Sequence, residues 1–239
     1  MLNRISTGPP AKDLAPWPSF IAACDECHVV READHRIANH LTLLAGFVRL
    51  KSAGLTDDMA ALGSREVRLL LQGICAQLET VAHMHRALLA ETQVFPDLGQ
   101  YLHSVCDGFS SVLAGRIALI EALGADCHLS AGSVLPVTQI VSEAITNAIK
   151  HARPLGDGCV ITVGCRKADG GRLVVEIADN GWGLPDRFDP ATDGGLGFRL
   201  IRGLASQAGA RLAFRSGTGG LVVELNLPAA PDLEPLGER

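Results

Sequence analysis

SEAITNAIKHA, residues 142–152, is the segment on which the interpretation of the whole chain depends. Successive residues of a helix turn by about 100°, so a helix here has an apolar face made of Val141, Ile145, Ala148 and Ile149. The opposite face is polar and is made of Glu143, Asn147, Lys150 and His151. A carboxylate, a carboxamide, an ammonium and an imidazole within two turns suit a polar ligand that is held together with a metal ion. On this segment alone, a solvated helix face is an equally good interpretation.

The composition indicates a globular protein and argues against several functions. Of the 239 residues, 47% are hydrophobic, and the mean hydropathy is +0.22, as in chains that form a packed core. The formal net charge of -5, without a basic stripe, argues against a nucleic-acid partner. No apolar run approaches the roughly 18 residues of a membrane span, and the first residues lack the apolar core of a signal peptide. We therefore expect a cytoplasmic protein with no membrane segment.

The N-terminal third predicts a helical hairpin. Residues 1–20 contain four prolines, which forbid a regular helix and indicate a flexible tail. A first apolar helical repeat follows, made of Val30, Ala33, Ile37, Leu41, Leu44 and Val48, and a second is made of Val67, Leu71, Ile74, Leu78, Val81, His85 and Leu88. Two helices alone enclose no core, so we expect the hairpin over 21–95 to pair with a second copy as a dimeric four-helix bundle. A monomer requires the other domain to cover the stripe.

Residues 96–230 predict a second domain of the α+β class, followed by a frayed tail over 231–239. Helical patterns cover 98–123 and 134–152, and strand patterns cover 159–165, 172–178, 210–216 and 221–227. Glycine-rich turns join the strands into two hairpins. We expect helices packed on one face of a mixed sheet.

Two glycine clusters frame a candidate site. Asp179 ends a predicted strand, and Gly181 and Gly183 beside it let the backbone approach a flat ring that offers an amine to the carboxylate. A second cluster, residues 194–197, opens a short helix, and amides at a helix N-terminus bind anions. Either cluster alone is weak, but their order after the Asn147 helix is specific.

These segments together resemble the ATP-binding domain of the GHKL class, which sensor histidine kinases share with type II topoisomerases and MutL. Residues 143–152 resemble the N box of the kinases, and the two glycine clusters resemble their two glycine boxes. The resemblance implies that Asn147 holds Mg²⁺, that Glu143 orients metal-bound water or the phosphoacceptor, and that Asp179 reads the adenine amine of ATP. It also implies that ATP is contacted by Lys150, His151, Gly181, Gly183, Gly195, Leu196 and Gly197. The lid between the glycine boxes is short, and only Phe188 could stand in for a phenylalanine box.

EADHRIANHL, residues 32–41, resembles the phosphoacceptor box of the HWE and closely related histidine kinases, which HRxxN marks. His35 lies about 160° to 180° from the apolar stripe of its helix, so we expect it to be exposed. The resemblance implies that His35 accepts phosphate. Arg36 follows it where many kinases place an acidic base, which leaves Glu32 or Asp34 as the candidate base.

The sequence thus predicts a histidine kinase of a two-component system that passes phosphate from ATP through His35 to an aspartate of a response regulator. The dimerising hairpin carries the acceptor, and a separate sensor partner is compatible with the short N-terminal tail. Two alternatives stay open: a histidine phosphotransferase relay whose ATPase-like domain is not catalytic, and a GHKL serine kinase acting as an anti-sigma switch. Nucleotide binding separates the first alternative, and acid-stable phosphate would mark the second.

Overall fold

The computed structural model describes residues 41–42, 45–46, 48–49, 52, 64–89, 95–113, 117–151 and 158–230. The described residues between 41 and 52 are helical, as the first repeat of the hairpin predicts. The predicted acceptor His35, its candidate bases Glu32 and Asp34, and both predicted tails lie outside the described residues.

Five strands form one mixed sheet in the order β1-β2-β3-β5-β4. They are β1 Ile117–Leu123, β2 Cys159–Ala168, β3 Arg172–Asp179, β4 Arg211–Gly217 and β5 Gly220–Pro228. β1 runs parallel to β2, and the other neighbouring pairs are antiparallel. The β2–β3 and β4–β5 hairpins are the two that the sequence predicts.

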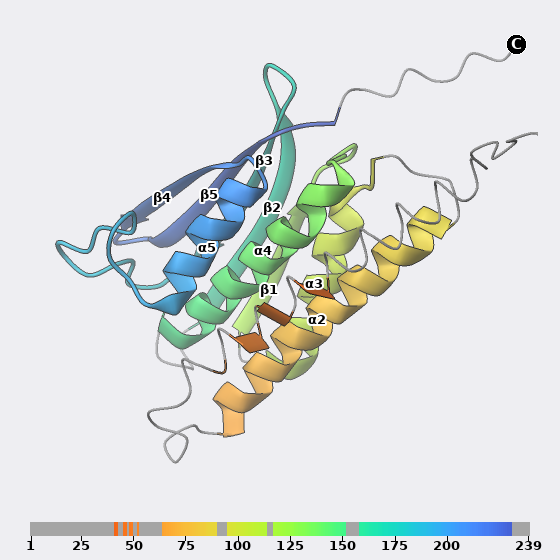
Figure 1. Cartoon of the computed structure of the whole chain (residues 1–239). Helices are drawn as coiled ribbons and strands as arrows, with labels where there is room; N and C mark the ends of the chain where they lie inside the picture. Colours follow the sequence, from red (N-terminus) through yellow and green to blue (C-terminus); the bar gives the residue numbers. More distant parts are fainter. Residues whose placement is uncertain are drawn as a thin grey trace, which may run out of the picture.

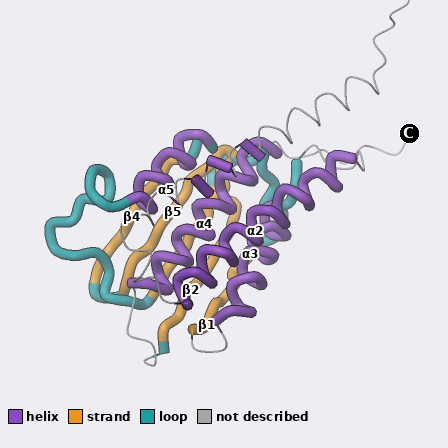
Figure 2. The backbone as a smooth tube through the Cα atoms, turned by 60° about the horizontal axis from the view of Figure 1, so that its bottom comes forward, coloured by secondary structure: helices purple, strands orange, loops and turns teal. Residues whose placement is uncertain are grey.

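Three helices, α3 Leu98–Leu113, α4 Ala131–His151 and α5 Leu196–Gln207, cover one face of this sheet (Figure 1). The helix α2 Ser64–Leu89 packs on α3 and α4. Figure 2 shows the same helical layer beside the sheet from a second direction. The predicted α+β sandwich with helices on one face of a mixed sheet is therefore confirmed. Within the described part of the chain, no helix combines the length and apolarity that a membrane crossing requires.

The central helix α4 lies in the core because its apolar residues meet the sheet, α2 and α5. Its predicted apolar face is buried, with Val141 and Ile145 at 0% exposure, Ala148 at 7% and Ile149 at 5%. It begins at Ala131, earlier than the predicted residue 134.

The long helix α2 has two apolar faces that differ in exposure. Leu69 and Val81 are buried in the core that α2 forms with α3 and α4, so the prediction that Val81 belongs to the exposed bundle stripe is wrong. Val67, Leu71 and Leu78, which belong to the predicted bundle stripe, are 42%, 55% and 48% exposed. The described residues of this chain thus leave much of that stripe uncovered.

The prediction of a helix over 98–123 is wrong in its second half, because IALIEAL forms the strand β1 and α3 ends at Leu113. Alanine, leucine and glutamate favour helices, and apolar residues on both faces of the strand hide its period of two. The strand forms because β2 pairs with it along its whole length. Tertiary pairing has overridden local propensity here.

Candidate functional site

A cavity of about 630 Å³ lies between the C-terminal half of α4, the end of β3 and the N-terminal end of α5. Its volume is typical of small-molecule sites. Most of the predicted site residues line it, namely Glu143, Asn147, Lys150, His151, Asp179, Gly183, Gly195, Leu196 and Gly197. Gly181 is buried and does not belong to the lining. The structure therefore brings the polar helix face and both glycine clusters to one place.

The polar face of α4 changes from buried to exposed along the helix. Glu143 is 3% exposed, Asn147 is half-buried, and Lys150 and His151 are exposed in the last turn. A cationic side chain is favourable there because the carbonyl end of a helix carries partial negative charge. The cavity thus has oxygen donors at its inner end and an ammonium and an imidazole at its mouth.

Asp179 is held in place by the backbone on both sides of it. Its Oδ1 accepts hydrogen bonds from the N–H of Gly181 at 2.8 Å and from the N–H of Leu221 at 3.3 Å. The start of β5 passes close by, since a β-carbon on Gly220 would lie 1.9 Å from the Asp179 carbonyl oxygen. The carboxylate at the end of β3 is therefore fixed before any ligand arrives.

The N-terminus of α5 reaches the polar face of α4. Gly195 precedes the helix with φ -73° and ψ -161°, and it offers no side chain to cap the first amides. Gly197 packs so closely that a β-carbon there would lie 2.5 Å from Glu143 Oε1 and 3.3 Å from Asn147 Nδ2. Uncapped amides at this end suit an anion.

Chemically, the cavity offers an anchored carboxylate on one side and amides with a nearby ammonium on the other. The first suits an amine donor and the second suits an anion. The oxygens of Glu143 and Asn147 between them are the ligand type that a hard cation such as Mg²⁺ prefers. The residues present therefore fit an anionic ligand with an exocyclic amine, bound together with a hard cation.

Comparison with known families agrees with this chemistry. Residues 132–231 match the family described as histidine kinase-, DNA gyrase B-, and HSP90-like ATPase. Residues 32–113 match the family described as histidine kinase. Both parts of the chain thus match families of histidine kinase domains. The resemblance inferred from the sequence boxes is thereby confirmed.

Two curated relatives are sensor kinases. Blue-light-activated histidine kinase 2 of Erythrobacter litoralis (strain HTCC2594) is 28% identical over 201 residues, which cover 82% of this chain and 56% of that protein. The nitrate/nitrite sensor protein NarQ of Escherichia coli (strain K12) is 27% identical over 199 residues, covering 80% of this chain and 32% of that protein. The chain thus spans only part of the length of both relatives.

A solved structure shares the fold. The histidine kinase domain of a blue-light activated histidine kinase from Erythrobacter litoralis superposes with a TM-score of 0.62 at 22% identity. The match covers 87% of this chain and 94% of that domain. The similarity extends over the helical and the sheet parts together.

Asn180 supports the site, although the sequence did not single it out. Its Oδ1 accepts a hydrogen bond from the N–H of Val160 at 2.9 Å, and its Nδ2 donates to the Gly158 carbonyl at 2.9 Å. The end of β3 is thereby fastened to the start of β2, next to Asp179. In the sequence, an asparagine before a glycine indicates only a turn.

Ser216 fastens the first glycine loop to β4. Its Oγ accepts a hydrogen bond from the N–H of Leu184 at 2.6 Å. A β-carbon on Gly183, whose φ is +72°, would lie 2.5 Å from the same oxygen. Only glycine fits this position, because both the backbone angle and the neighbouring hydroxyl exclude a side chain. No motif in the sequence pointed to the serine.

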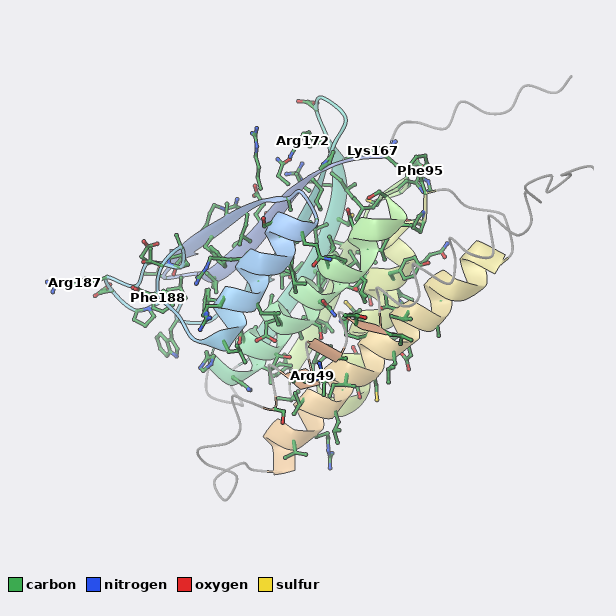
Figure 3. All side chains as sticks on the ribbon, in the orientation of Figure 1. Arg49, Phe95, Lys167, Arg172, Arg187 and Phe188 are labelled. Carbon is green, nitrogen blue, oxygen red and sulfur yellow. The ribbon has the colours of Figure 1, made fainter. Side chains whose placement is uncertain are left out.

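The lid, residues 184–194, forms part of the wall of the cavity through Leu184, Pro185, Phe188 and Gly194. The ring of Phe188 lies 5.2 Å from that of Phe198 on α5, and Phe198 lies 5.4 Å from Phe214 on β4. Figure 3 shows Phe188 in the loop beside α5 and Arg187 pointing away from the sheet. Three aromatic rings thus connect the lid to the sheet. That Phe188 replaces a phenylalanine box stays a prediction.

Proposed function

We propose that the chain is the core of an ATP-dependent, autophosphorylating protein-histidine kinase of a two-component system. It transfers the γ-phosphoryl group of Mg·ATP to His35, and a response regulator aspartate then receives it. The observation that carries this proposal is the cavity in which the polar face of α4 meets the uncapped N-terminus of α5.

ATP fits the two ends of the cavity. The Oδ1 of Asp179 is occupied by two backbone amides, which leaves Oδ2 to accept a hydrogen bond from the adenine amine. The amides of Gly195, Leu196 and Gly197 at the start of α5 suit the phosphates. Lys150 and His151 at the mouth of the cavity add donors on the same side.

Mg²⁺ fits between these ends. Asn147 would hold the ion through its side-chain oxygen, and the buried carboxylate of Glu143 would orient metal-bound water. When bound, the ion neutralises charge on the phosphoryl oxygens. Both side chains pack under Gly197, where an added β-carbon would lie 2.5 Å from Glu143 Oε1 and 3.3 Å from Asn147 Nδ2.

The residues of the chain account for every bond and proton in the transfer of the γ-phosphoryl group to His35. A neutral imidazole nitrogen of His35 attacks the γ-phosphorus, the new P–N bond forms, and the bond to the bridging oxygen of ADP breaks. The other ring nitrogen then loses its proton to a base, for which Glu32 and Asp34 are the candidates. Transfer to the aspartate of a response regulator regenerates His35.

One further feature supports the dimeric part of the proposal. The exposed Val67, Leu71 and Leu78 on α2 offer an apolar stripe, as expected if residues 21–95 dimerise as a four-helix bundle while residues 96–230 bind ATP. We place the protein in the cytoplasm, where a response regulator and a separate sensor partner would meet it.

Asn147→Ala tests the nucleotide site. Binding of ATP is measured by calorimetry with Mg²⁺ and with EDTA, and we expect the wild type to bind more tightly with Mg²⁺. Asn147→Ala should lose this difference. Asn226→Ala is the matched control, because Asn226 bonds Arg172 on β3 away from the cavity. A variant at Asn147 that keeps the full Mg²⁺ dependence would refute the metal role, and a wild type that binds no ATP would refute the proposed function.

A further inference from the structure

The lid of this kinase is a folded turn. Asp189 Oδ1 accepts a hydrogen bond from the N–H of Ala191 at 2.9 Å, and the Asp189 carbonyl accepts one from the N–H of Asp193 at 2.6 Å. The Asp193 carboxylate accepts a hydrogen bond from the N–H of Asp189 at 2.9 Å. Thr192 donates its hydroxyl proton to Asp189 Oδ2 at 3.0 Å. The turn over 189–193 is therefore tied together by its own hydrogen bonds.

This turn is attached to α5 by Arg202. The Nη1 of Arg202 donates to the carbonyl of Pro190 at 2.7 Å and to the carbonyl of Asp193 at 3.1 Å. Arg202 is half-buried, and hydrogen bonds from a charged donor are stronger than neutral ones. The guanidinium is thus hydrogen-bonded to the beginning and to the end of the turn. The ring contact of Phe188 with Phe198 is a second, apolar attachment to the same helix.

The Arg202 contact also fixes how the chain enters the second glycine cluster. Asp193, whose carbonyl Arg202 holds, is followed directly by Gly194 with φ +95°. A β-carbon on Gly194 would lie 2.8 Å from Phe198 Cβ, so the chain is pressed against the first turn of α5. Gly195 then starts the helix whose amides face the cavity. The position of these amides therefore depends on where the turn is held.

We propose that Arg202 is a positioning residue that sets the phosphate end of the nucleotide site by holding the lid against α5. It touches neither the ligand nor the metal, since it does not line the cavity. This inference rests on the proposed function, in which the cavity binds Mg·ATP. It predicts a selective effect: loss of the guanidinium weakens binding of the triphosphate and leaves adenosine, which occupies the Asp179 end, nearly unchanged.

The test compares Arg202→Met, Arg202→Lys and the matched control Arg211→Met, an exposed arginine at the start of β4. Affinity is measured for Mg·ATP by calorimetry and for adenosine by NMR shift titration, and amide hydrogen exchange is measured over 184–195 without ligand. Arg202→Met should bind Mg·ATP about tenfold more weakly and should exchange lid amides faster. Arg202→Lys should recover part of the Mg·ATP affinity and part of the slow lid exchange. Arg211→Met should have the affinity and the lid exchange of the wild type. The melting temperature shows whether each variant is folded.

The outcomes separate the two proposals. If the wild type binds Mg·ATP and Arg202→Met binds it equally well with an unchanged lid exchange, the role of Arg202 is refuted while the nucleotide site stands. If Arg202→Met lowers the affinities for adenosine and for Mg·ATP by the same factor, Arg202 acts on the whole fold. Its positioning role is then likewise refuted. If the wild type binds neither ligand, the proposed function falls, and the inference about Arg202 falls with it.

Discussion

The carboxylate of Glu143 lies directly against the backbone of Gly197, so that a β-carbon at position 197 would fall 2.5 Å from Oε1. This contact joins the polar face of α4 to the first turn of α5. Glu143 is 3% exposed and lines the cavity, so a shift of its carboxylate would change the cavity. The contact with Glu143 therefore favours glycine at position 197 whether or not a ligand is bound.

Gly197→Ala should displace Glu143 and weaken Mg·ATP binding. We expect a loss of about tenfold, equivalent to about 1.4 kcal/mol, with a small change in melting temperature because the disturbed group is the end of a side chain. Gly203→Ala on the same helix is the control, since nothing lies within 4 Å of the added β-carbon. Equal affinities of the two variants, measured by calorimetry, would show that the contact does not matter for binding.

Gly220→Ala should destabilise the fold itself. The new β-carbon would lie 1.9 Å from the Asp179 carbonyl oxygen, and the φ of +111° disfavours any side chain. We expect the free energy of unfolding to fall by about 2 kcal/mol, measured by urea titration. Gly219→Ala, with nothing within 4 Å of its β-carbon, should remain within about 0.5 kcal/mol of the wild type. A stable Gly220→Ala variant would mean that β5 does not pass Asp179 this closely.

His103 should titrate above its ordinary value. Its Nδ1–H donates to Glu121 Oε2 at 2.8 Å, and this hydrogen bond, followed by the charges of Glu121 and Asp107, raises the pKa of the imidazole from 6.5. The raised pKa favours the folded state while the ring is charged in it, so this contribution is complete below about pH 6.5 and is lost as the pH rises through the folded-state value. NMR titration should show the pKa fall in Glu121→Gln, and fall less in Asp107→Asn. An unchanged pKa in Glu121→Gln would contradict the pairing of α3 with β1.

Leu71→Glu should weaken the proposed dimer. Leu71 is 55% exposed on α2. In a symmetric dimer each copy would carry the new carboxylate, so the interface would bury two charges. We expect the dimer dissociation constant to rise about 100-fold, measured by light scattering over a dilution series. Glu79→Lys, on the same helix but outside the stripe, should have little effect. A wild type that is monomeric at every concentration would contradict the bundle.

The sequence predicted those parts of the fold in which the spacing of apolar residues follows the period of a helix or a strand and marks one buried face. The two faces of α4 follow from the spacing of Val141, Ile145 and Ile149 against Glu143, and the four strands of the two hairpins alternate or end in glycine turns. The strand β1 was missed because isoleucine, leucine and alanine occupy both of its faces, so nothing in the segment distinguishes a strand from a helix. Only the parallel pairing with β2 makes it a strand.

The candidate site could be predicted where residue type alone carries the chemistry. Asp179, Asn147 and the glycines belong to this group, and the structure gathers them around one cavity. Ser216 and Arg202 could not be found in this way, because they act through backbone groups that lie 32 and 12 positions away along the chain. Such contacts have no local signature in a sequence.

The most direct test of the central claim is to incubate the protein with γ-labelled Mg·ATP and to map the phosphate that is stable in base and labile in acid. The account predicts one labelled histidine, His35, with no label in His35→Gln and full label in the neighbouring control His40→Gln. Label that persists in His35→Gln, or phosphate that survives acid, would contradict the assignment of this chain as a kinase that phosphorylates His35.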